Sequence, residues 1–256
     1  MNVVNYYTNV YNEENRLGNN CDNRHKVERI VKTQLLANII RKNKIKKICE
    51  LGAGTGLYSL YFAKKGYKVS ACDLVPRHVE IIKKKSDLNK LNVETYVCNA
   101  NNTPFKSEEF DIVLVSGPIY HTNSLNNKIK IINEARRIVK DNGIIVVDYL
   151  SDIHGYIQHV LLDNNFLDKN IDLEDMDDIF SYDNKDKMKD LAKITNLDLL
   201  DIYGVDSITR FIKNDINKLS EEHLNKWIDF ITYVSNNKNI IDLSEHCLAI
   251  FKKQEI

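Results

Sequence analysis

Glycine and acidic residues follow a short apolar stretch at a spacing suited to binding a ribose-containing ligand. Residues 48–51 lead into Gly52, Gly54 and Gly56, and Asp73 stands at the end of the next apolar stretch. Glycine has no side chain to block a close approach of the backbone to a ligand. The helix expected after the glycines offers unpaired N–H groups and the positive end of its dipole. An acid about 20 residues beyond such a turn can accept hydrogen bonds from ribose hydroxyls.

The spacing of the glycines distinguishes between two ligands. The dinucleotide fingerprint G-x-G-x-x-G requires glycine at the position of Leu57. The spacing from Glu50 through Gly56 is instead E-x-G-x-G-x-G, and residues 48–73 resemble a class I methyltransferase that uses S-adenosylmethionine. A tight turn without a ligand is the alternative. The resemblance implies S-adenosylmethionine as cofactor, S-adenosylhomocysteine as product, and these cofactor contacts: Tyr7, Arg16, Glu50, Gly52, Ala53, Gly54, Thr55, Gly56, Tyr58, Asp73, Leu74, Asn99, Ala100, Asn101, Ser116 and Gly117.

Asn99 follows the strand expected at 93–98, where class I methyltransferases usually carry aspartate followed by alanine. The acid accepts a hydrogen bond from the adenine amino group. Because an amide oxygen can also accept, we expect Asn99 and Ala100 to contact adenine, with an ordinary polar loop as the alternative.

A second resemblance lies in residues 116–121, Ser-Gly-Pro-Ile-Tyr-His, which follow the strand expected at 110–115. Ligands of open α/β sheets bind beyond the carboxyl ends of strands, so this segment should face the reacting groups. It resembles the Gly-Pro-hydrophobic-Tyr-His signature of a group of small bacterial class I methyltransferases. Residues 7–17 resemble the N-terminal Tyr/acidic/Arg-Leu segment of the same group, and residues 206–210 and 244–246 resemble its C-terminal landmarks. The expected catalytic residues are His121 and Tyr120. The expected acceptor contacts are Tyr11, Pro118, Tyr120, His121, Tyr149, Asp206, Arg210 and His246.

His121 has two open interpretations. A histidine has an ordinary pKa of about 6.5 and can accept the acceptor's proton near neutral pH. It can equally be a histidine that only hydrogen-bonds to backbone. His154 and His159 have no acidic partner at metal-ligand spacing, so we expect no metal site.

Composition narrows the class of partner and compartment. The 256 residues include 36 Lys+Arg and 36 Asp+Glu, and this balance argues against a nucleic-acid acceptor. None of the five cysteines forms a C-x-x-C pair, which predicts a reducing compartment without disulfides. No apolar run approaches the roughly 20 residues of a membrane span, and we expect a cytoplasmic monomer or homodimer.

The elements that position these residues alternate between strand and helix. After an amphipathic helix at 26–42, continuous β-branched runs alternate with helical patterns, as in a parallel sheet buried on both faces. The prediction is a doubly wound, Rossmann-like, seven-stranded α/β sheet with helices on both faces. Strands are expected at 45–50, 68–72, 93–98, 110–115, 144–149, 197–204 and 247–251, and helices at 57–65, 77–90, 126–140 (ended by Gly143), 185–195 and 220–235.

Residues 1–256 are expected to form a single domain with a cap. Residues 150–183 read as irregular, and about 40 residues separate the last two strands. The cap is expected from residues 1–42, 150–183 and 206–242, with the N-terminal tyrosines as a lid or, alternatively, a frayed tail. A cap favours methyl transfer to a nitrogen or oxygen of an enclosed small molecule. A methyltransferase acting on RNA or protein and an accessory protein that binds the cofactor without turnover stay open.

Overall fold

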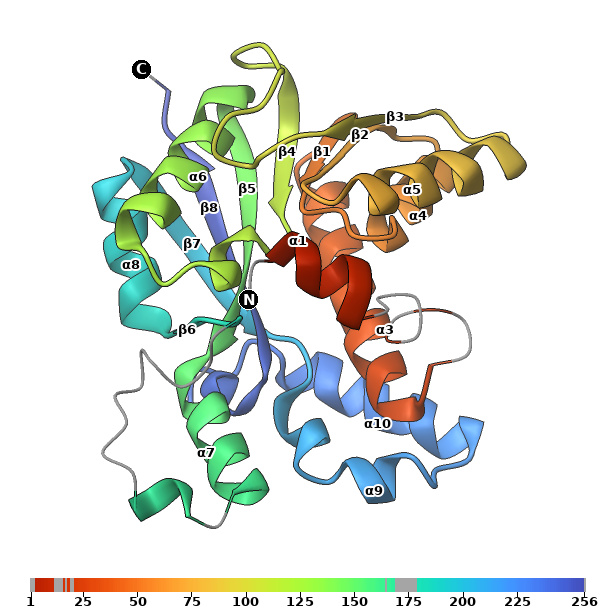
Figure 1. Cartoon of the computed structure of the whole chain (residues 1–256), viewed down its shortest axis with the longest axis vertical. Helices are drawn as coiled ribbons and strands as arrows, with labels where there is room; N and C mark the ends of the chain where they lie inside the picture. The colour runs from red at the N-terminus through yellow and green to blue at the C-terminus, as the bar shows by residue number, and fades with distance from the viewer. Residues whose placement is uncertain are drawn as a thin grey trace.

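The computed structural model in Figure 1 describes residues 3–11, 16, 18, 21–163, 165–168 and 179–255. Within them the strands form one eight-stranded sheet in the order β3-β2-β1-β4-β5-β8-β7, with β6 beside the end of β5. Among these strands β8 alone runs opposite to the others, so its pairings with β5 and β7 are antiparallel. The doubly wound fold is confirmed, and the structure adds the short β6. The strands are β1 (Lys47–Leu51), β2 (Lys68–Asp73), β3 (Val93–Val97), β4 (Phe110–Val115), β5 (Val139–Ser151), β6 (Tyr182–Asp183), β7 (Leu197–Gly204) and β8 (His246–Lys253).

Helices cover both faces of the sheet. Alternate residues of β4 point to opposite sides, so Leu114 packs with α3, α4 and α10 while Val113 packs with α6 and α8. Both residues are fully buried, which explains the continuous apolar run. The longer helices are α3 (Asn23–Lys42), α4 (Leu57–Lys64), α5 (Pro76–Leu88), α6 (Leu125–Ile138), α7 (Asp152–Leu162), α8 (Lys185–Ile194) and α10 (Glu221–Val234). Shorter turns are α1 (Val3–Asn5), η1 (Tyr6–Val10), η2 (Pro118–His121), η3 (Phe166–Asp168), η4 (Ser207–Arg210), α9 (Lys213–Ile216) and η5 (Ile241–Leu243).

Two local predictions are wrong. Helix α6 ends at Ile138, and Gly143 lies inside β5 instead of ending the helix. A Cβ at Gly143 would lie 2.7 Å from the Lys140 carbonyl oxygen, so close packing explains the glycine. Residues 152–162 form the regular helix α7, whose first turn is capped by Ser151 accepting from the His154 N–H.

The N-terminal turns lie in front of the point where β1 and β4 end (Figure 1). Helices α7, α9 and α10 lie below the sheet in the same view, and α10 packs along α3. Within the described residues, every helix is too short or too polar to cross a membrane.

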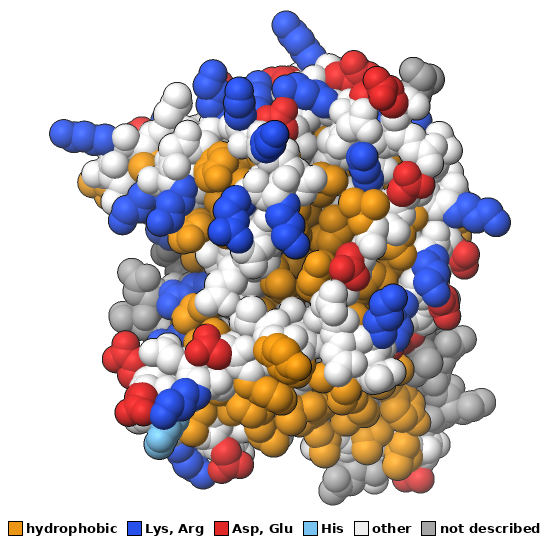
Figure 2. All heavy atoms as spheres, turned by 180° about the vertical axis from the view of Figure 1, so that it is seen from behind, with side chains coloured by type: hydrophobic (Ala, Val, Ile, Leu, Met, Phe, Trp, Pro, Cys, Tyr) orange, Lys and Arg blue, Asp and Glu red, His pale blue; other side chains and the backbone are white. Residues whose placement is uncertain are grey.

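The opposite face of the molecule carries hydrophobic side chains across its lower part (Figure 2). Large exposed hydrophobic residues of α7, η3 and α10 include Leu161, Leu162, Leu167, Phe230 and Tyr233. None of these five lines the cavity described below.

Candidate active site

A cavity of about 600 Å³ opens at the carboxyl ends of β1, β2, β4 and β5. Its wall combines the glycine turn after β1, the loops after β2, β3 and β4, and one side of α3. The described residues on the wall include Tyr7, Arg16, Glu28, Lys32, Glu50, Gly52, Ala53, Gly54, Thr55, Tyr58, Asp73, Leu74, His78, Cys98, Asn99, Ala100, Asn101, Ser116, Gly117, Pro118, Tyr120, His121, Ile131, Asp148, His246 and Leu248.

The glycine turn leaves space that a side chain would fill. Gly52, Gly54 and Gly56 all have positive φ, at 78°, 53° and 86°. A Cβ at Gly52 would lie 2.4 Å from the Ser116 carbonyl oxygen, so β1 and the loop after β4 approach each other closely only with glycine there. Gly56 is not on the cavity wall; a Cβ there would lie 2.8 Å from the Ile82 side chain of α5.

Asp73 is held at the cavity wall by the backbone around it. One carboxylate oxygen accepts from the Gly54 N–H at 2.7 Å, and the other accepts from the Val75 N–H at 2.8 Å. His78 Nδ1 lies 3.2 Å from the second oxygen. These contacts fix the carboxylate where the glycine turn and the end of β2 meet, and oxygens with two lone pairs can accept further bonds from a ligand.

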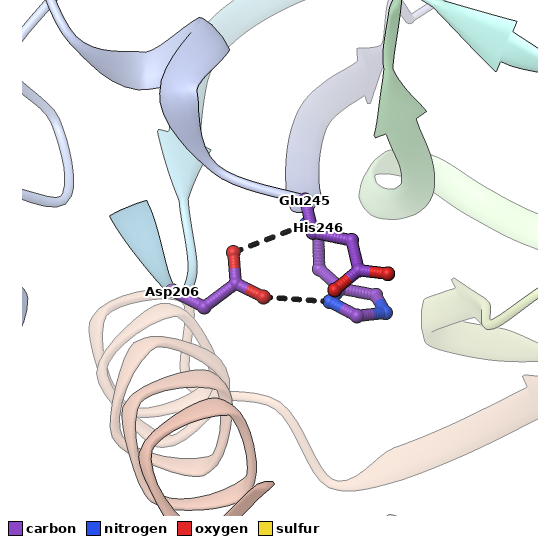
Figure 3. Close-up of side chains that lie close together, drawn as sticks. All are labelled: Asp206, Glu245 and His246. Carbon is purple, nitrogen blue, oxygen red and sulfur yellow. Dashed lines mark hydrogen bonds and ion pairs between the residues drawn. The ribbon is translucent and has the colours of Figure 1, made fainter. Parts of the chain in front are cut away.

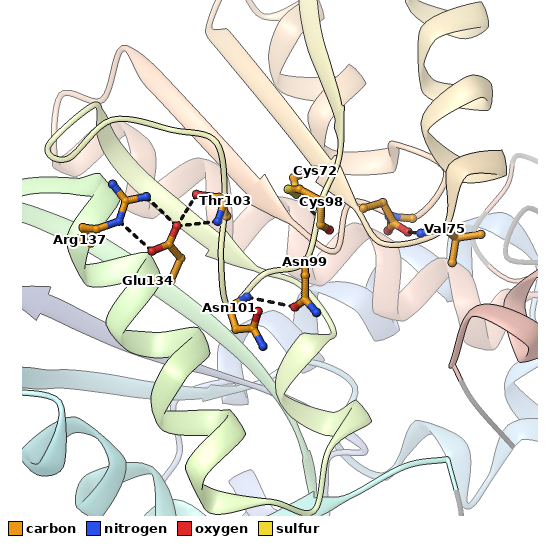
Figure 4. The surroundings of a disulfide bond; sticks show 10 residues. Cys72, Val75, Cys98, Asn99, Asn101, Thr103, Glu134 and Arg137 are labelled. Atoms are coloured by element: carbon orange, nitrogen blue, oxygen red, sulfur yellow. Dashed lines mark hydrogen bonds and ion pairs between the residues drawn. A yellow bond between two sulfur atoms is a disulfide. The ribbon is translucent and has the colours of Figure 1, made fainter.

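Leu74, Asn99, Ala100, Asn101 and Ile131 line the end of the cavity nearest β3. The Asn99 side-chain oxygen accepts from the Asn101 N–H at 3.2 Å (Figure 4). This bond orients the Asn99 amide, while the apolar side chains of Leu74 and Ile131 provide surfaces suited to a flat ring.

A disulfide joins Cys72 and Cys98 beside this end (Figure 4). The prediction of a chain without disulfides is therefore wrong. The two residues are 26 positions apart in sequence, but pairing of β2 with β3 brings their Cα atoms within 5.9 Å. Cysteine spacing alone does not reveal such a pair, because it depends on which strands are neighbours.

Glu50 is a buried acid at the centre of the cavity wall, only 1% exposed. It accepts a hydrogen bond from the Ser59 hydroxyl of α4. Burial raises the pKa of Glu50 to about 7, although the Ser59 bond and the charge of Lys32 oppose the change. A cation bound beside Glu50 would favour its ionised form.

Beyond Glu50 the cavity runs under α3, where sequence reasoning predicted Tyr58 but missed Lys32 and Asp148. Lys32 forms a buried ion pair with Asp148 of β5, and its ammonium lies 4.4 Å from the centre of the Tyr58 ring. Burial raises the pKa of Asp148, with Lys32 partly offsetting the effect. The Tyr58 hydroxyl is buried without a hydrogen-bond partner among the described residues, so it can bond to a ligand.

A second set of charges continues from this end. The Arg16 guanidinium donates to Glu28 at 2.9 Å and lies 3.2 Å from His246 Nε2. Burial raises the pKa of Glu28, but the charges of Arg16 and His246 outweigh burial and lower it to about 2. His246 Nδ1 in turn lies 2.8 Å from an Asp206 oxygen. This end of the cavity is thus polar, buried and internally charge-paired.

Asp206, Glu245 and His246 place ligand-type atoms within 4.8 Å of one another (Figure 3). Their other contacts indicate an ion-pair network. Glu245 pairs with Arg210 at 2.7 Å and Arg24 at 3.5 Å. Burial lowers the pKa of His246, but Glu28 and Asp206 outweigh it and raise the pKa overall, which favours a cationic ring.

His121 lies on η2 at the edge of the cavity and is half-buried. Its Nε2 lies 3.1 Å from the Tyr7 hydroxyl, and its Nδ1 lies 3.1 Å from the Ile179 carbonyl oxygen. The ring thus contacts backbone on one side and Tyr7 of the cavity wall on the other, and its role as a base stays a prediction.

The structure brings most of the predicted site residues together. Among the predicted cofactor contacts, only Gly56 is off the described cavity wall. Pro118, Tyr120, His121 and His246 also line it. Tyr11 instead stacks on Tyr6 with ring centres 5.5 Å apart.

Three further predicted acceptor contacts, besides Tyr11, lie off the described wall. Tyr149 is fully buried with Cys247 in the core beneath α8, so its expected place in the cleft is wrong. Successive strand residues face opposite sides, and Asp148 is the one that faces the cavity. Arg210 is paired with Glu245 and Gln158, and Asp206 lies behind His246.

The expected cap segments contribute unequally to the wall. Residues 1–42 supply Tyr7, Arg16, Glu28 and Lys32. Among the described parts of 150–183 and 206–242, none supplies a lining residue. These two segments reach the site through the Ile179 carbonyl and through Asp206. Residues 1–2, 12–15, 17, 19–20, 164 and 169–178 of the expected cap lie outside the described residues.

The wall fits S-adenosylmethionine. The glycine turn leaves room for backbone contact, Asp73 suits ribose hydroxyls, and Leu74, Asn99 and Ile131 suit adenine. Glu50 suits the cationic end of the cofactor. Burial disfavours the ionised carboxylate, Ser59 and Lys32 offset this only in part, and a cation beside Glu50 would favour the ionised form further. Every one of these features depends on residues present in this chain.

Comparison with known proteins gives matches in the same region. Residues 49–147 match the family described as a methyltransferase domain. The chain is 28% identical over 123 residues to the ubiquinone biosynthesis O-methyltransferase of Pelagibacter ubique, covering 44% of this chain and 50% of the relative. It is 34% identical over 67 residues to a 23S rRNA (uracil(747)-C(5))-methyltransferase of Pyrococcus abyssi, covering 26% and 16%. The chain thus spans half or less of the length of these two curated relatives.

A solved structure agrees over a larger part of the chain. The S-adenosylmethionine-dependent methyltransferase from Clostridium acetobutylicum superposes with a TM-score of 0.60 over 88% of this chain and 92% of that one. At 13% identity this likeness establishes the fold. Residues 49–147 therefore match a methyltransferase domain, and the chain shares the fold of that solved methyltransferase.

Proposed function

We propose that this protein transfers a methyl group from S-adenosylmethionine to a nitrogen or oxygen atom of a small-molecule acceptor. One observation carries the proposal. The cavity continues past the glycine turn into a buried polar end lined by Lys32, Tyr58 and Asp148. A cofactor at the turn would leave that end for a second, small polar molecule, since the buried Tyr58 hydroxyl needs a hydrogen-bond partner.

The residues of the wall would divide the work of binding. Asp73 would accept from the ribose hydroxyls, and Asn99 with Ala100 would contact adenine. Glu50 would lie near the cationic methionine portion. S-adenosylmethionine supplies a methyl group already activated by its sulfonium, so the protein must chiefly align the acceptor and exclude water.

The acceptor's surroundings favour a small molecule over a macromolecule. The polar end lies under α3 and is closed by Glu28 together with Arg16 and His246, which both pair with the Glu28 carboxylate. Formal net charge is zero, so the chain has no excess of positive charge to attract a phosphate backbone. The segment at 116–121 also resembles the signature of small bacterial methyltransferases, which supports placing this chain in that group.

A transfer assay tests the proposal. The protein is incubated with S-adenosylmethionine labelled in the methyl group and with separate low-molecular-weight, RNA and protein fractions of a cell extract. We expect label in the low-molecular-weight fraction and stoichiometric S-adenosylhomocysteine. Label only in RNA or protein would contradict the small-molecule acceptor. Binding of S-adenosylhomocysteine without transfer to any fraction would indicate an accessory protein.

A further inference from the structure

We propose that Tyr7 takes the acceptor's proton and passes its own hydroxyl proton to His121, an inference that rests on the proposed methyl transfer. Tyr7 and His121 both line the cavity. Tyr7 lies on η1 and His121 on η2, 114 residues apart in sequence. The Tyr7 hydroxyl lies 3.1 Å from His121 Nε2. This transfer of protons from the acceptor through Tyr7 to His121, here called the relay, makes Tyr7 a catalytic residue as well as a lining residue of the cavity.

The direction of the hydrogen bonds follows from the Ile179 carbonyl. A carbonyl oxygen only accepts, so His121 Nδ1 must carry the hydrogen in the 3.1 Å contact with Ile179. In a neutral imidazole the other nitrogen, Nε2, is then the acceptor. The Tyr7 hydroxyl therefore donates to Nε2. The backbone carbonyl has the orienting role that a carboxylate has in many histidine-containing sites.

This arrangement changes how His121 can act as a base. Its accepting nitrogen is engaged by Tyr7, so an acceptor proton reaches His121 directly only if Tyr7 moves away. The Tyr7 oxygen can accept a hydrogen bond while it donates one. A proton transferred to that oxygen can be matched by departure of the hydroxyl proton to Nε2, which leaves tyrosine neutral before and after the step.

Aromatic rings hold the pair and limit access of water. The His121 ring packs against Phe180 at 5.2 Å and Tyr120 at 4.9 Å between ring centres. The Tyr7 ring meets His121 edge-on at 5.4 Å. This packing keeps the Tyr7 hydroxyl directed at His121 Nε2. The hydroxyl proton can then move to Nε2 with only small displacements of the two side chains.

Other titratable groups lie beside the pair and enter the test. His78 of α5 has its ring centre 5.6 Å from that of Tyr7, and its Nδ1 faces Asp73. Tyr120 directly precedes His121 in η2. Tyr6 of η1 lies edge-on to Tyr7, with 5.1 Å between the ring centres. Among these groups Tyr7 makes the direct contact with His121 Nε2, which is why its hydroxyl is assigned to the relay.

The proton and electron balance of the step is simple. The acceptor's lone pair forms a bond to the methyl carbon, and the carbon–sulfur bond breaks with its electron pair moving to sulfur. The acceptor's proton moves to the Tyr7 oxygen as the Tyr7 hydroxyl proton moves to His121 Nε2. The products are the methylated acceptor, S-adenosylhomocysteine, a neutral Tyr7 and a cationic His121, which later loses its proton to solvent.

The kinetic test uses Tyr7→Phe, with Tyr6→Phe as matched control because it removes one hydroxyl from the adjacent tyrosine. Tyr6 is not among the described wall residues. We expect Tyr7→Phe to lower kcat about a hundredfold, within the range for general-base catalysis, with S-adenosylhomocysteine affinity changed less than about twofold. His121→Ala should give a similar loss, and the double variant should lose no more than either single one, because the residues act as a unit. Unchanged kcat in Tyr7→Phe, or multiplicative losses, would overturn the relay.

A spectroscopic test needs no acceptor. Nitrogen NMR of the His121 ring should show the neutral form protonated at Nδ1, and Tyr7→Phe should shift the Nε2 resonance while Tyr6→Phe leaves it in place. Protonation at Nε2 in the wild type would overturn the relay whatever the protein catalyses. Absence of any transfer by a wild type that has the expected tautomer would overturn the proposed function instead, and with it the catalytic use of the pair.

Discussion

Lys32 of α3 and Asp148 of β5 form an ion pair inside the cavity, although 116 residues separate them in sequence. Both side chains are buried, and the Lys32 ammonium also lies over the Tyr58 ring. The pair joins the helix that covers the cavity to a strand of the sheet. It therefore couples the stability of the fold to the shape of the buried polar end of the cavity.

Lys32→Met should destabilise the protein by about 3–5 kcal/mol, because Asp148 would be left buried without its cation. Lys32→Met combined with Asp148→Asn should recover much of that loss, since no uncompensated charge then stays buried. Urea denaturation measures both. Lys189→Met is the control, as it breaks an ion pair between exposed side chains and should leave stability unchanged. Equal effects of Lys32→Met and Lys189→Met would show that the buried pair is unimportant.

Asp73→Ala should weaken S-adenosylhomocysteine binding by about 1–3 kcal/mol, because ribose hydroxyls would lose their acceptor. The variant also removes acceptors for the Gly54 and Val75 N–H groups, so Asp73→Asn is measured beside it. Asp87→Asn, on the exposed side of α5, is the control. Calorimetry gives the affinities, and wild-type affinity in a folded Asp73→Ala would place the ribose elsewhere.

The parts of the site that the sequence predicted share one property: their positions follow from a single element. Gly52 and Gly54 follow the end of β1, Asp73 ends β2, and all carboxyl ends of parallel strands meet at one edge of the sheet. The continuous β-branched runs likewise predicted the sheet itself. Such features need no knowledge of which strands are neighbours.

The missed features depend on packing between elements. Lys32 lies on a helix with apolar residues around it. Glu28 and Lys32 are four residues apart and so share one face of α3, but this face is known to line the cavity only once the packing of α3 is known. Asp148 and Tyr149 are adjacent, so choosing which faces the site requires the pleat of β5. The Cys72–Cys98 bond requires the pairing of β2 with β3.

The stability of the unliganded protein should fall as pH rises from about 4.5 to about 7 through the contribution of Glu50. Because its pKa is raised in the folded state, that state binds more protons than the unfolded chain in this window, which favours folding at the lower pH. The contribution amounts to something on the order of 3 kcal/mol. Glu50→Gln should remove it, so thermal melts across this range should show a smaller pH dependence in the variant. An identical dependence in both proteins would mean that Glu50 is not perturbed.

Ligand binding should show the opposite trend through the same residue. The cationic α-ammonium group of S-adenosylhomocysteine would favour ionised Glu50, so affinity for this ligand should increase as pH rises toward 7 and then level off. Glu50→Gln should bind more weakly at pH 8 and lose this slope. Calorimetry in buffers of different ionisation enthalpy also reports the proton released on binding. Release of no proton below pH 7 would contradict the assignment.

Under non-reducing conditions, a denatured sample should expose three thiols rather than five, because Cys72 and Cys98 are joined and Cys21, Cys49 and Cys247 are free. Thiol labelling followed by mass spectrometry gives the count. Cys72→Ser should release Cys98 for labelling, whereas Cys247→Ser should remove one labelled thiol and leave the bond intact. Five reactive thiols in the untreated wild type would contradict the disulfide.

Calorimetric titration of the wild type and Gly52→Val with S-adenosylhomocysteine and with NADH tests the central claim, that the glycine turn holds S-adenosylmethionine. The added side chain would meet the Ser116 carbonyl oxygen and Pro118, within 2.4 Å and 2.7 Å at Cβ. We predict that the wild type binds S-adenosylhomocysteine and not NADH, and that Gly52→Val loses this binding while circular dichroism shows a folded protein. Binding of NADH by the wild type, or undiminished S-adenosylhomocysteine binding by Gly52→Val, would contradict the account.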